Sequence, residues 1–248
     1  MTTRPLDGWR VLVPRGGKWG DNVSALLRSR GAIPVVAPMI NFAGTDDAAA
    51  LTEALVELQA GSYDWLVVTS ATTVDVLSGQ SVAVPSTTRV AAVGETTAAA
   101  LTLAGYRVDF IPSDNSARGL VKEWPDEAGR ALIPQSDLAE PTLVEGLAER
   151  GLEATFVAAY RTVGVAVEQR IRDDVASGRI GAMLVSSGSV ARQMAAQFVL
   201  PESTVVACIG PRTAFDARAA GLTVDVIADE RSVESLVDAM VEHIASLA

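Results

Sequence analysis

The chain has 248 residues, 49% of them hydrophobic, which is enough for one large domain or two of ordinary size. The net charge of −10 argues against a general nucleic-acid binder, and the single Cys208 excludes an intramolecular disulfide and a cysteine cluster for a metal. No apolar run approaches the roughly 20 residues of a membrane-spanning helix, and residues 11–13 are too short for the core of a signal peptide. We therefore expect a cytoplasmic protein that binds neither membrane nor nucleic acid.

Short apolar segments alternate with amphipathic ones in the first part of the chain. Residues 11–14 predict a strand and residues 21–30 a helix. Residues 33–42 predict extended chain because two prolines interrupt them. Thr45 is predicted to cap the next helix. Residues 63–69 then form a strand whose apolar run is typical of a sheet covered on both faces.

The second half of the chain repeats this order. Residues 90–97, read as a strand, a glycine turn and the start of a helix, match residues 206–213 at an offset of 116. Each copy continues into a second predicted strand, at residues 105–110 and 221–226. We interpret the match as an internal duplication. Strands that alternate with helices in this way predict an α/β fold of two similar domains, each with a parallel sheet flanked by helices.

Hydroxyl side chains gather at the predicted strand-to-helix turns of both halves. Ligands of open parallel sheets bind beyond the carboxyl ends of the strands, where free backbone N–H groups of helix first turns can bind anions. One such Ser or Thr is more often a helix cap, but the recurrence of the set favours a ligand surface for carboxylates or phosphates. The set comprises Thr69, Ser70, Thr72, Thr73, Thr97, Ser116, Ser186, Ser187, Ser189, Thr213 and Ser232.

The two glycine turns at the centre of the repeat share a further feature. Pro211 suits the first position of a helix, which places Thr213, and by analogy Thr97, on the third helical residue. A structural helix start explains Gly94 and Gly210, but it does not explain a hydroxyl at the same place in both copies.

Other catalytic patterns are missing. There is no dinucleotide-binding fingerprint, and residues 16–20 do not satisfy the phosphate-loop pattern. The only histidine, His243, falls in the last predicted helix, which argues against a catalytic triad or a histidine metal site, so no metal or cofactor is expected. The remaining titratable candidate is Tyr160, on an extended segment equivalent to residues 38–42. Its ring can simply pack, or its phenol can act as a general acid.

With these features the chain resembles the uroporphyrinogen-III synthase family over nearly its whole length. No single segment is specific, but their order and spacing together are. The matching segments are residues 11–15, 68–70, 93–97, 159–162, 186–190 and 209–214.

The resemblance implies two domains joined by a two-stranded β connector, with the active site in the cleft between them. One domain would be discontinuous, taking residues 1–38 and 162–248, and the other would take residues 43–157. The connector strands would be residues 39–42 and 158–161.

The resemblance also implies the reaction. The family closes the linear tetrapyrrole hydroxymethylbilane, which carries eight carboxylates, into uroporphyrinogen III with loss of water and inversion of the last pyrrole ring, without a cofactor. We expect a monomer. Tyr160 matches the family tyrosine that assists departure of the hydroxyl as general acid. The positions that match substrate-binding residues are Arg15, Ser70, Ala71, Thr72, Gly94, Thr97, Ser187, Gly188, Ser189, Gly210 and Thr213.

Two positions depart from this pattern, and two other functions stay open. The second copy has Gln135 at the position that Arg15 occupies in the first copy, and it has Gly188 where proline is expected. A two-lobed intracellular sensor or binding protein for a carboxylated ligand is the alternative to the enzyme. A nucleotide-dependent enzyme is disfavoured because its fingerprints are missing.

Overall fold

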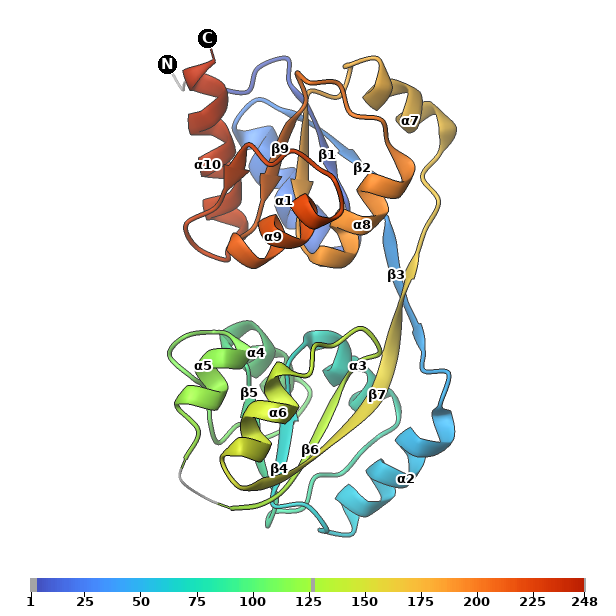
Figure 1. The fold of residues 1–248 in the computed structure, drawn as a ribbon, viewed down its shortest axis with the longest axis vertical. Coiled ribbons are helices and arrows are strands. Elements are labelled where there is room, and N and C mark those ends of the chain that lie inside the picture. Colours follow the sequence, from blue (N-terminus) through green and yellow to red (C-terminus); the bar gives the residue numbers. More distant parts are fainter. Residues whose placement is uncertain (1–3, 126–127, 248) are drawn as a thin grey trace. The chain divides into compact units, whose positions relative to one another are not determined.

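The computed structural model describes residues 4–125 and 128–247. The chain divides into two compact units, unit 1 formed by Met1–Asn41 and Val163–Ala248, and unit 2 by Phe42–Thr162. The chain leaves unit 1 within strand β3 (Ile40–Gly44) and returns within strand β7 (Leu152–Gly164) (Figure 1). The assignment of residues 39–42 and 158–161 as a connector remains a proposal.

Unit 1 is built on a five-stranded sheet in the order β10-β9-β8-β1-β2, with parallel pairing throughout. Helices α1 and α10 cover one face of the sheet, and α7, α8 and α9 cover the other. The elements are β1 (Arg10–Val13), α1 (Gly17–Ser29), β2 (Ile33–Val36), α7 (Gln169–Ala176), β8 (Ala182–Val185), α8 (Gly188–Gln197), β9 (Val205–Cys208), α9 (Pro211–Ala219), β10 (Val226–Ile227) and α10 (Val233–Ser246).

Unit 2 repeats this arrangement with the order β3-β7-β6-β4-β5, in which β4, β5, β6 and β7 pair in parallel. Helices α2, α3 and α4 cover one face, and α5 and α6 cover the other. The elements are α2 (Ala48–Gln59), β4 (Trp65–Val68), α3 (Ala71–Gly79), β5 (Arg89–Ala92), α4 (Glu95–Leu103), α5 (Ala117–Lys122), β6 (Gly129–Ser136) and α6 (Thr142–Glu149). The predicted α/β class, with parallel sheets flanked by helices, is confirmed.

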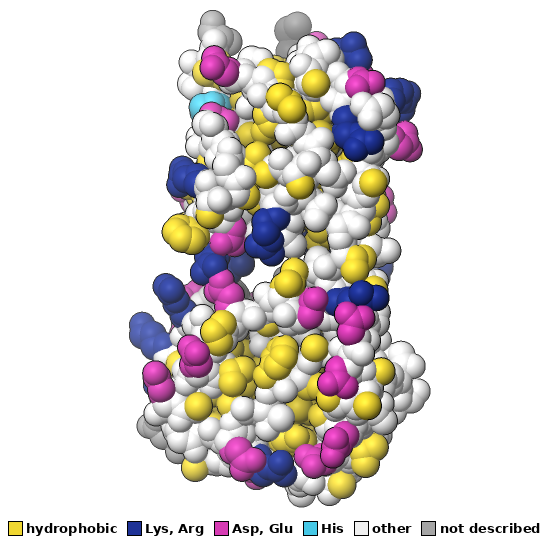
Figure 2. Space-filling view, turned by 45° about the vertical axis from the view of Figure 1, so that its right-hand side comes forward, with side chains coloured by type: hydrophobic (Ala, Val, Ile, Leu, Met, Phe, Trp, Pro, Cys, Tyr) yellow, Lys and Arg dark blue, Asp and Glu magenta, His cyan; other side chains and the backbone are white. Residues whose placement is uncertain are grey.

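The surface mixes charges of both signs. Figure 2 shows lysine and arginine side chains interleaved with aspartate and glutamate on the face that it draws, with hydrophobic side chains between them. In the described part of the chain no helix has the length and apolar character needed to cross a membrane.

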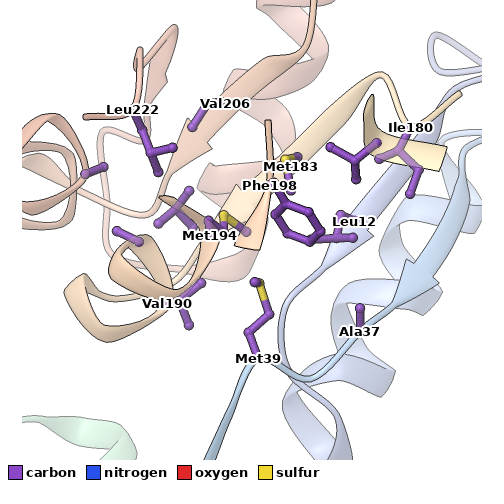
Figure 3. Close-up of a cluster of buried hydrophobic side chains, with 14 of the residues drawn as sticks. Leu12, Ala37, Met39, Ile180, Met183, Val190, Met194, Phe198, Val206 and Leu222 are labelled. Carbon is purple, nitrogen blue, oxygen red and sulfur yellow. The ribbon is translucent and has the colours of Figure 1, made fainter. Parts of the chain in front are cut away.

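The central strands β4, β8 and β9 are buried on both faces of their sheets, as their unalternating apolar runs predict. In unit 1, Leu12 of β1 and Met183 of β8 meet Met194 of α8 and the neighbouring Phe198 (Figure 3). Burying a side chain of this size contributes about 1.5–3 kcal/mol. These contacts fix the helices to the sheet and thereby position the turns between strand and helix.

The second strand predicted in each copy is largely absent. Residues 105–110 form only an isolated bridge between Ala91 and Phe110, and residues 221–226 contribute a single residue to the two-residue strand β10. In both copies an aspartate carboxylate replaces a ladder partner: Asp109 accepts a hydrogen bond from the Val90 N–H at 2.9 Å, and Asp225 accepts one from the Val206 N–H at 2.8 Å. In each copy the aspartate carboxylate therefore takes the place of the backbone carbonyl that would accept this N–H group in a regular sheet.

Two helix starts also differ from the prediction. Helix α1 begins at Gly17 rather than near residue 21, so the glycine-rich stretch is its first turn. Helix α2 is capped by Asp47, whose carboxylate accepts the Ala50 N–H at 3.0 Å, whereas Thr45 accepts the Asp47 N–H outside the helix. Both Asp and Thr suit this role, so residue type alone did not decide between them.

A buried carboxylate, Asp174 of α7, ties that helix to the sheet. Hydrogen bonds from Arg179 first, and then from Arg10 of β1, hold the pKa of the Asp174 carboxyl below its ordinary value. A depressed pKa in the folded state stabilises the fold above the unfolded pKa, and this stability is lost as the pH falls through the folded pKa.

Replacing Asp174 by asparagine is therefore expected to lower the free energy of unfolding at pH 7. The difference from the wild type should shrink as the pH falls below about 4, the range in which free aspartate titrates. Urea unfolding across that range measures it, with Asp173→Asn, the exposed neighbour, as control. A difference that does not change with pH would contradict the assignment.

Candidate active site

The strand order places the candidate residues at one defined point of each unit. In unit 2 the chain runs from β4 to β5 on one side and from β6 to β7 on the other, so the order reverses between β4 and β6. Ligands of open α/β sheets bind beyond the carboxyl strand ends at such a reversal. Ser70 follows β4 at this point, and Gln135 lies at the end of β6. In unit 1 the equivalent reversal lies between β8 and β1, which lead into Ser187 and Arg15.

An irregularity in β7 brings Tyr160 to the reversal point of unit 2. Gln135 pairs with Ala158 and Ser136 pairs with Tyr160, so Ala159 is an extra residue in the strand. Ala159 and Tyr160 consequently both face the core beneath α2, α3 and α4, although consecutive residues of a regular strand point to opposite faces. Bulges re-aim side chains in this way, and they are frequent beside active sites.

Contacts of both its ring and its hydroxyl hold the Tyr160 side chain within unit 2. The hydroxyl lies 3.0 Å from Ser70 Oγ, and the ring meets the ring of Phe42 edge-on, with centroids 5.4 Å apart at 83°. Only 8% of the residue is exposed. The Tyr160 side chain is therefore compatible with both predictions, a ring that packs and a phenol held in a fixed position.

Ser70 caps helix α3. Its Oγ accepts the Thr73 N–H at 3.1 Å, and it also lies 3.1 Å from Thr73 Oγ1. Ala71 and Thr72 occupy the first turn, where the former is exposed and the latter half-buried. The turn thus presents backbone N–H groups next to the Tyr160 hydroxyl, but Ser70 itself is engaged within the protein.

The next turn, at the start of α4, contains a residue that the sequence did not reveal as part of the site. Asn115 Oδ1 accepts the Glu95 N–H at 3.1 Å and so occupies the start of the helix. A Cβ on Gly94 would lie 2.6 Å from that oxygen, which explains the glycine. Thr97 lies on the third residue of the helix and is buried, as predicted. Asn115 comes from the loop before α5, and its only sequence signal is that asparagine suits helix starts.

Replacing Gly94 by alanine is expected to displace Asn115 and lower the free energy of unfolding by about 0.5–2 kcal/mol, the usual effect of losing a cap. Asn115→Ala should cost a similar amount because it removes the same contact. Chemical denaturation of both variants and of the double variant measures the coupling. Full additivity of the two effects would show that they do not act through one interaction.

Unit 1 repeats these turns with different surroundings. Ser187 caps α8 by accepting the Val190 N–H at 3.3 Å, and its Oγ lies 2.9 Å from Ser189 Oγ. Gly210 precedes α9, in which Pro211 is the first residue and the buried Thr213 the third. The predicted geometry of the paired threonines within their helices is therefore observed in each unit.

The glycine at 188, where proline was expected, has a steric cause. A Cβ at Gly188 would collide with Asp216 Oδ2 of helix α9. Arg212 donates to the same carboxylate, from Nε to Oδ1 at 3.2 Å. A carboxylate of the protein thus approaches the start of α8 and leaves room for no side chain there.

The equivalent positions Arg15 and Gln135 differ in charge and environment. The Arg15 guanidinium lies over the Trp19 ring, 5.3 Å from its centroid, and is only half-buried. Gln135 is buried and donates from Nε2 to Thr69 Oγ1 at 3.2 Å. Unit 1 therefore carries a cation at its reversal point where unit 2 carries a neutral amide.

Cys208 is a core residue at the end of β9. Burial raises the pKa of its thiol to about 12, so the sulfur stays protonated and is a poor nucleophile. Among the described residues there is no group of three or more His, Cys, Asp or Glu side chains that could hold a metal ion. Tyr160 remains a candidate for proton transfer at the reversal point of unit 2.

Two doubly wound α/β units with matching hydroxyl-bearing turns define the class of this protein. A family model described as "Uroporphyrinogen-III synthase HemD" matches residues 21–238. The chain belongs to the uroporphyrinogen-III synthase family.

Curated relatives and solved structures agree with this assignment. The chain is 25% identical to "Porphyrin biosynthesis protein HemD" of Ruminiclostridium josui, over 96% of this chain and 49% of the relative. It is 27% identical to the uroporphyrinogen-III synthase of Synechococcus elongatus, over 65% of this chain and 64% of the relative. The chain therefore spans about half of one curated relative and under two thirds of the other.

The fold is shared with two solved uroporphyrinogen III synthases. That of Thermus thermophilus, a mutant, has 18% identity and a TM-score of 0.66, covering 96% of this chain and 99% of that one. That of Helicobacter pylori has 15% identity and a TM-score of 0.64, covering 94% and 98%.

Proposed function

We propose that this protein is a uroporphyrinogen-III synthase, which cyclises hydroxymethylbilane to uroporphyrinogen III with loss of water and inversion of ring D. The family membership supports the proposal, and one observation carries it: the bulge in β7 places the Tyr160 phenol at the reversal point of unit 2. We further propose that it acts in the cytoplasm as a monomer, without a cofactor, nucleic acid or membrane.

In this proposal Tyr160 is the general acid of the first step. The pyrrole nitrogen of the bilane pushes out the hydroxyl group while the phenol gives its proton to the departing oxygen, so that water leaves. The methylene carbon that lost the hydroxyl then bonds to the ring D carbon that already carries the bridge, which gives a spiro intermediate. The bridge bond to that carbon breaks, the released bridge carbon bonds to the free α-carbon of ring D, and the proton that this α-carbon loses returns to the phenolate, so ring D is inverted. Positioned proton donors of this kind contribute about 10²–10⁴-fold to a rate.

The carboxylates of the substrate would be bound by the helix starts. The turns at Ser70 to Thr72, Gly94, Ser187 to Ser189 and Gly210 supply, at the positive ends of helix dipoles, the backbone N–H groups that the protein's own caps do not bind. Arg15 adds a cation in unit 1. Such local donors are needed because the net charge of −10 opposes an anionic substrate.

Separation of the uroporphyrin isomers after oxidation tests the function. Freshly generated hydroxymethylbilane closes by itself without inversion, so the wild-type protein should convert the product from the type I to the type III isomer. Only type I at high protein concentration would overturn the synthase proposal. Tight binding of hydroxymethylbilane in the same sample, measured by calorimetry, would then support the alternative of a carboxylate-binding sensor.

A further inference from the structure

The hydroxyl of Tyr160 is the first of three connected hydroxyl groups. Tyr160 Oη lies 3.0 Å from Ser70 Oγ, and Ser70 Oγ lies 3.1 Å from Thr73 Oγ1. Thr73 Oγ1 in turn donates to the backbone carbonyl of Pro134 at 3.2 Å. Thr73 is fully buried. The chain of contacts therefore leads from the reversal point into the core and ends on a group that can only accept.

Each hydroxyl has one proton, and this fixes which group donates in each of the three hydrogen bonds. Thr73 has one hydroxyl proton, which the Pro134 carbonyl accepts. Ser70 must therefore be the donor in its contact with Thr73, and this uses the only proton of Ser70. Tyr160 is then the donor to Ser70. In the resting protein the proton of the phenol is directed at Ser70.

The duplication provides an internal comparison that separates this network from helix capping. Ser187 of unit 1 caps α8 as Ser70 caps α3, 117 positions earlier. Val190 stands where Thr73 stands in unit 2, and it donates only its backbone N–H to the cap. A cap at this turn therefore needs no hydroxyl at the third helical position. A contact between the cap serine and a hydroxyl at the third helical position is found only in the unit that contains Tyr160.

We propose that Ser70 and Thr73 are positioning residues that prepare Tyr160 to give up its proton, an inference that rests on the proposed synthase function. Before the reaction, Ser70 accepts the phenol proton and fixes the orientation of the Tyr160 O–H bond. When that proton passes to the departing hydroxyl group, the Ser70 O–H turns from Thr73 Oγ1 to the phenolate and donates to it. The proton lost by the closing macrocycle restores the phenol, and Ser70 turns back.

Hydrogen bonds to a charged oxygen are the strong ones, so removing the Ser70 donor is expected to slow the step that creates the phenolate. Ser70→Ala should lower kcat by about tenfold to a hundredfold, with KM little changed. Thr73→Val, which copies unit 1, should lower kcat by a smaller factor because the Ser70 contact remains. Asp47→Ala removes a comparable cap, at α2, and is the control for lost capping.

A spectroscopic readout tests the network without relying on turnover. The chain has three tyrosines, so ¹³C labelling of the tyrosine ring carbon bonded to oxygen gives three resonances, and Tyr160→Phe identifies one of them. Ser70→Ala and Thr73→Val should shift the Tyr160 resonance, whereas Asp47→Ala should leave it unmoved. An unmoved resonance in Ser70→Ala would overturn the network even if the protein proved not to be a synthase.

Measurements of turnover separate the positioning role of Ser70 and Thr73 from the synthase function itself. If the wild type makes the type III isomer and Ser70→Ala does so at the wild-type kcat, the positioning role is overturned and the synthase function stands. A lowered kcat together with a shifted resonance supports both.

Discussion

Tyr160→Phe is expected to lower kcat by about 10²–10⁴-fold, because it removes the proton donor that we propose for the first step. The ring is retained, so its edge-on contact with Phe42 and its place in the core should persist. The lost hydrogen bond to Ser70 should cost only about 0.5–1.5 kcal/mol of the free energy of unfolding. Steady-state turnover and urea unfolding of the same preparation separate the two effects.

Tyr106→Phe is the matched control. The Tyr106 hydroxyl donates to the Val82 carbonyl at 2.9 Å, and we assign it no part in substrate binding or proton transfer. Its loss should reduce stability by a similar amount and leave turnover unchanged. Wild-type turnover in Tyr160→Phe would dismiss Tyr160 as the acid.

Thr213→Val is expected to lower kcat/KM by about tenfold to a hundredfold, the range for losing a hydrogen bond to a charged group. Thr97→Val should have a similar effect. Both residues lie largely buried in the first turn of a helix, and neither hydroxyl has a hydrogen-bond partner among the described residues. Neither hydroxyl oxygen is among the side-chain oxygen atoms that the protein encloses completely and leaves without a partner, so each hydroxyl is available to a ligand.

Stability distinguishes this role from a structural one. Valine keeps the shape of threonine and removes no hydrogen bond of the fold, so the free energy of unfolding should stay nearly the same or rise. Thr102→Val, which removes a hydroxyl that donates to the Ala98 carbonyl at 3.0 Å, serves as control and should leave kcat/KM unchanged. Reduced stability with unchanged kcat/KM in Thr213→Val would contradict substrate binding.

The duplication made much of the fold predictable. A match over a whole strand–turn–helix segment implied that both halves would pack their strands and helices in the same way. The equivalent strands do follow the same order in both sheets. Apolar runs without alternation correctly indicated strands covered on both faces. Serine before a helix correctly indicated caps at Ser70, Ser187 and Ser232, because each short side chain reaches the free N–H group three residues on.

Other features depend on contacts between distant segments. The extra residue of β7 leaves no mark in the sequence, since Ala159 is neither glycine nor part of a turn signal, and only its pairing with β6 reveals it. The aspartates that replace ladder partners at 109 and 225 looked like polar positions of a strand. Asn115 and Asp216 approach helix starts from other elements, so spacing along the chain could not place them.

The most direct test is the fraction of type III isomer formed from hydroxymethylbilane as the protein concentration rises, measured in parallel for the wild type and Tyr160→Phe. The wild type should drive the fraction towards completion, whereas Tyr160→Phe at equal concentration should leave mainly the spontaneous type I isomer. Type I alone from the wild type at every concentration would contradict the synthase function.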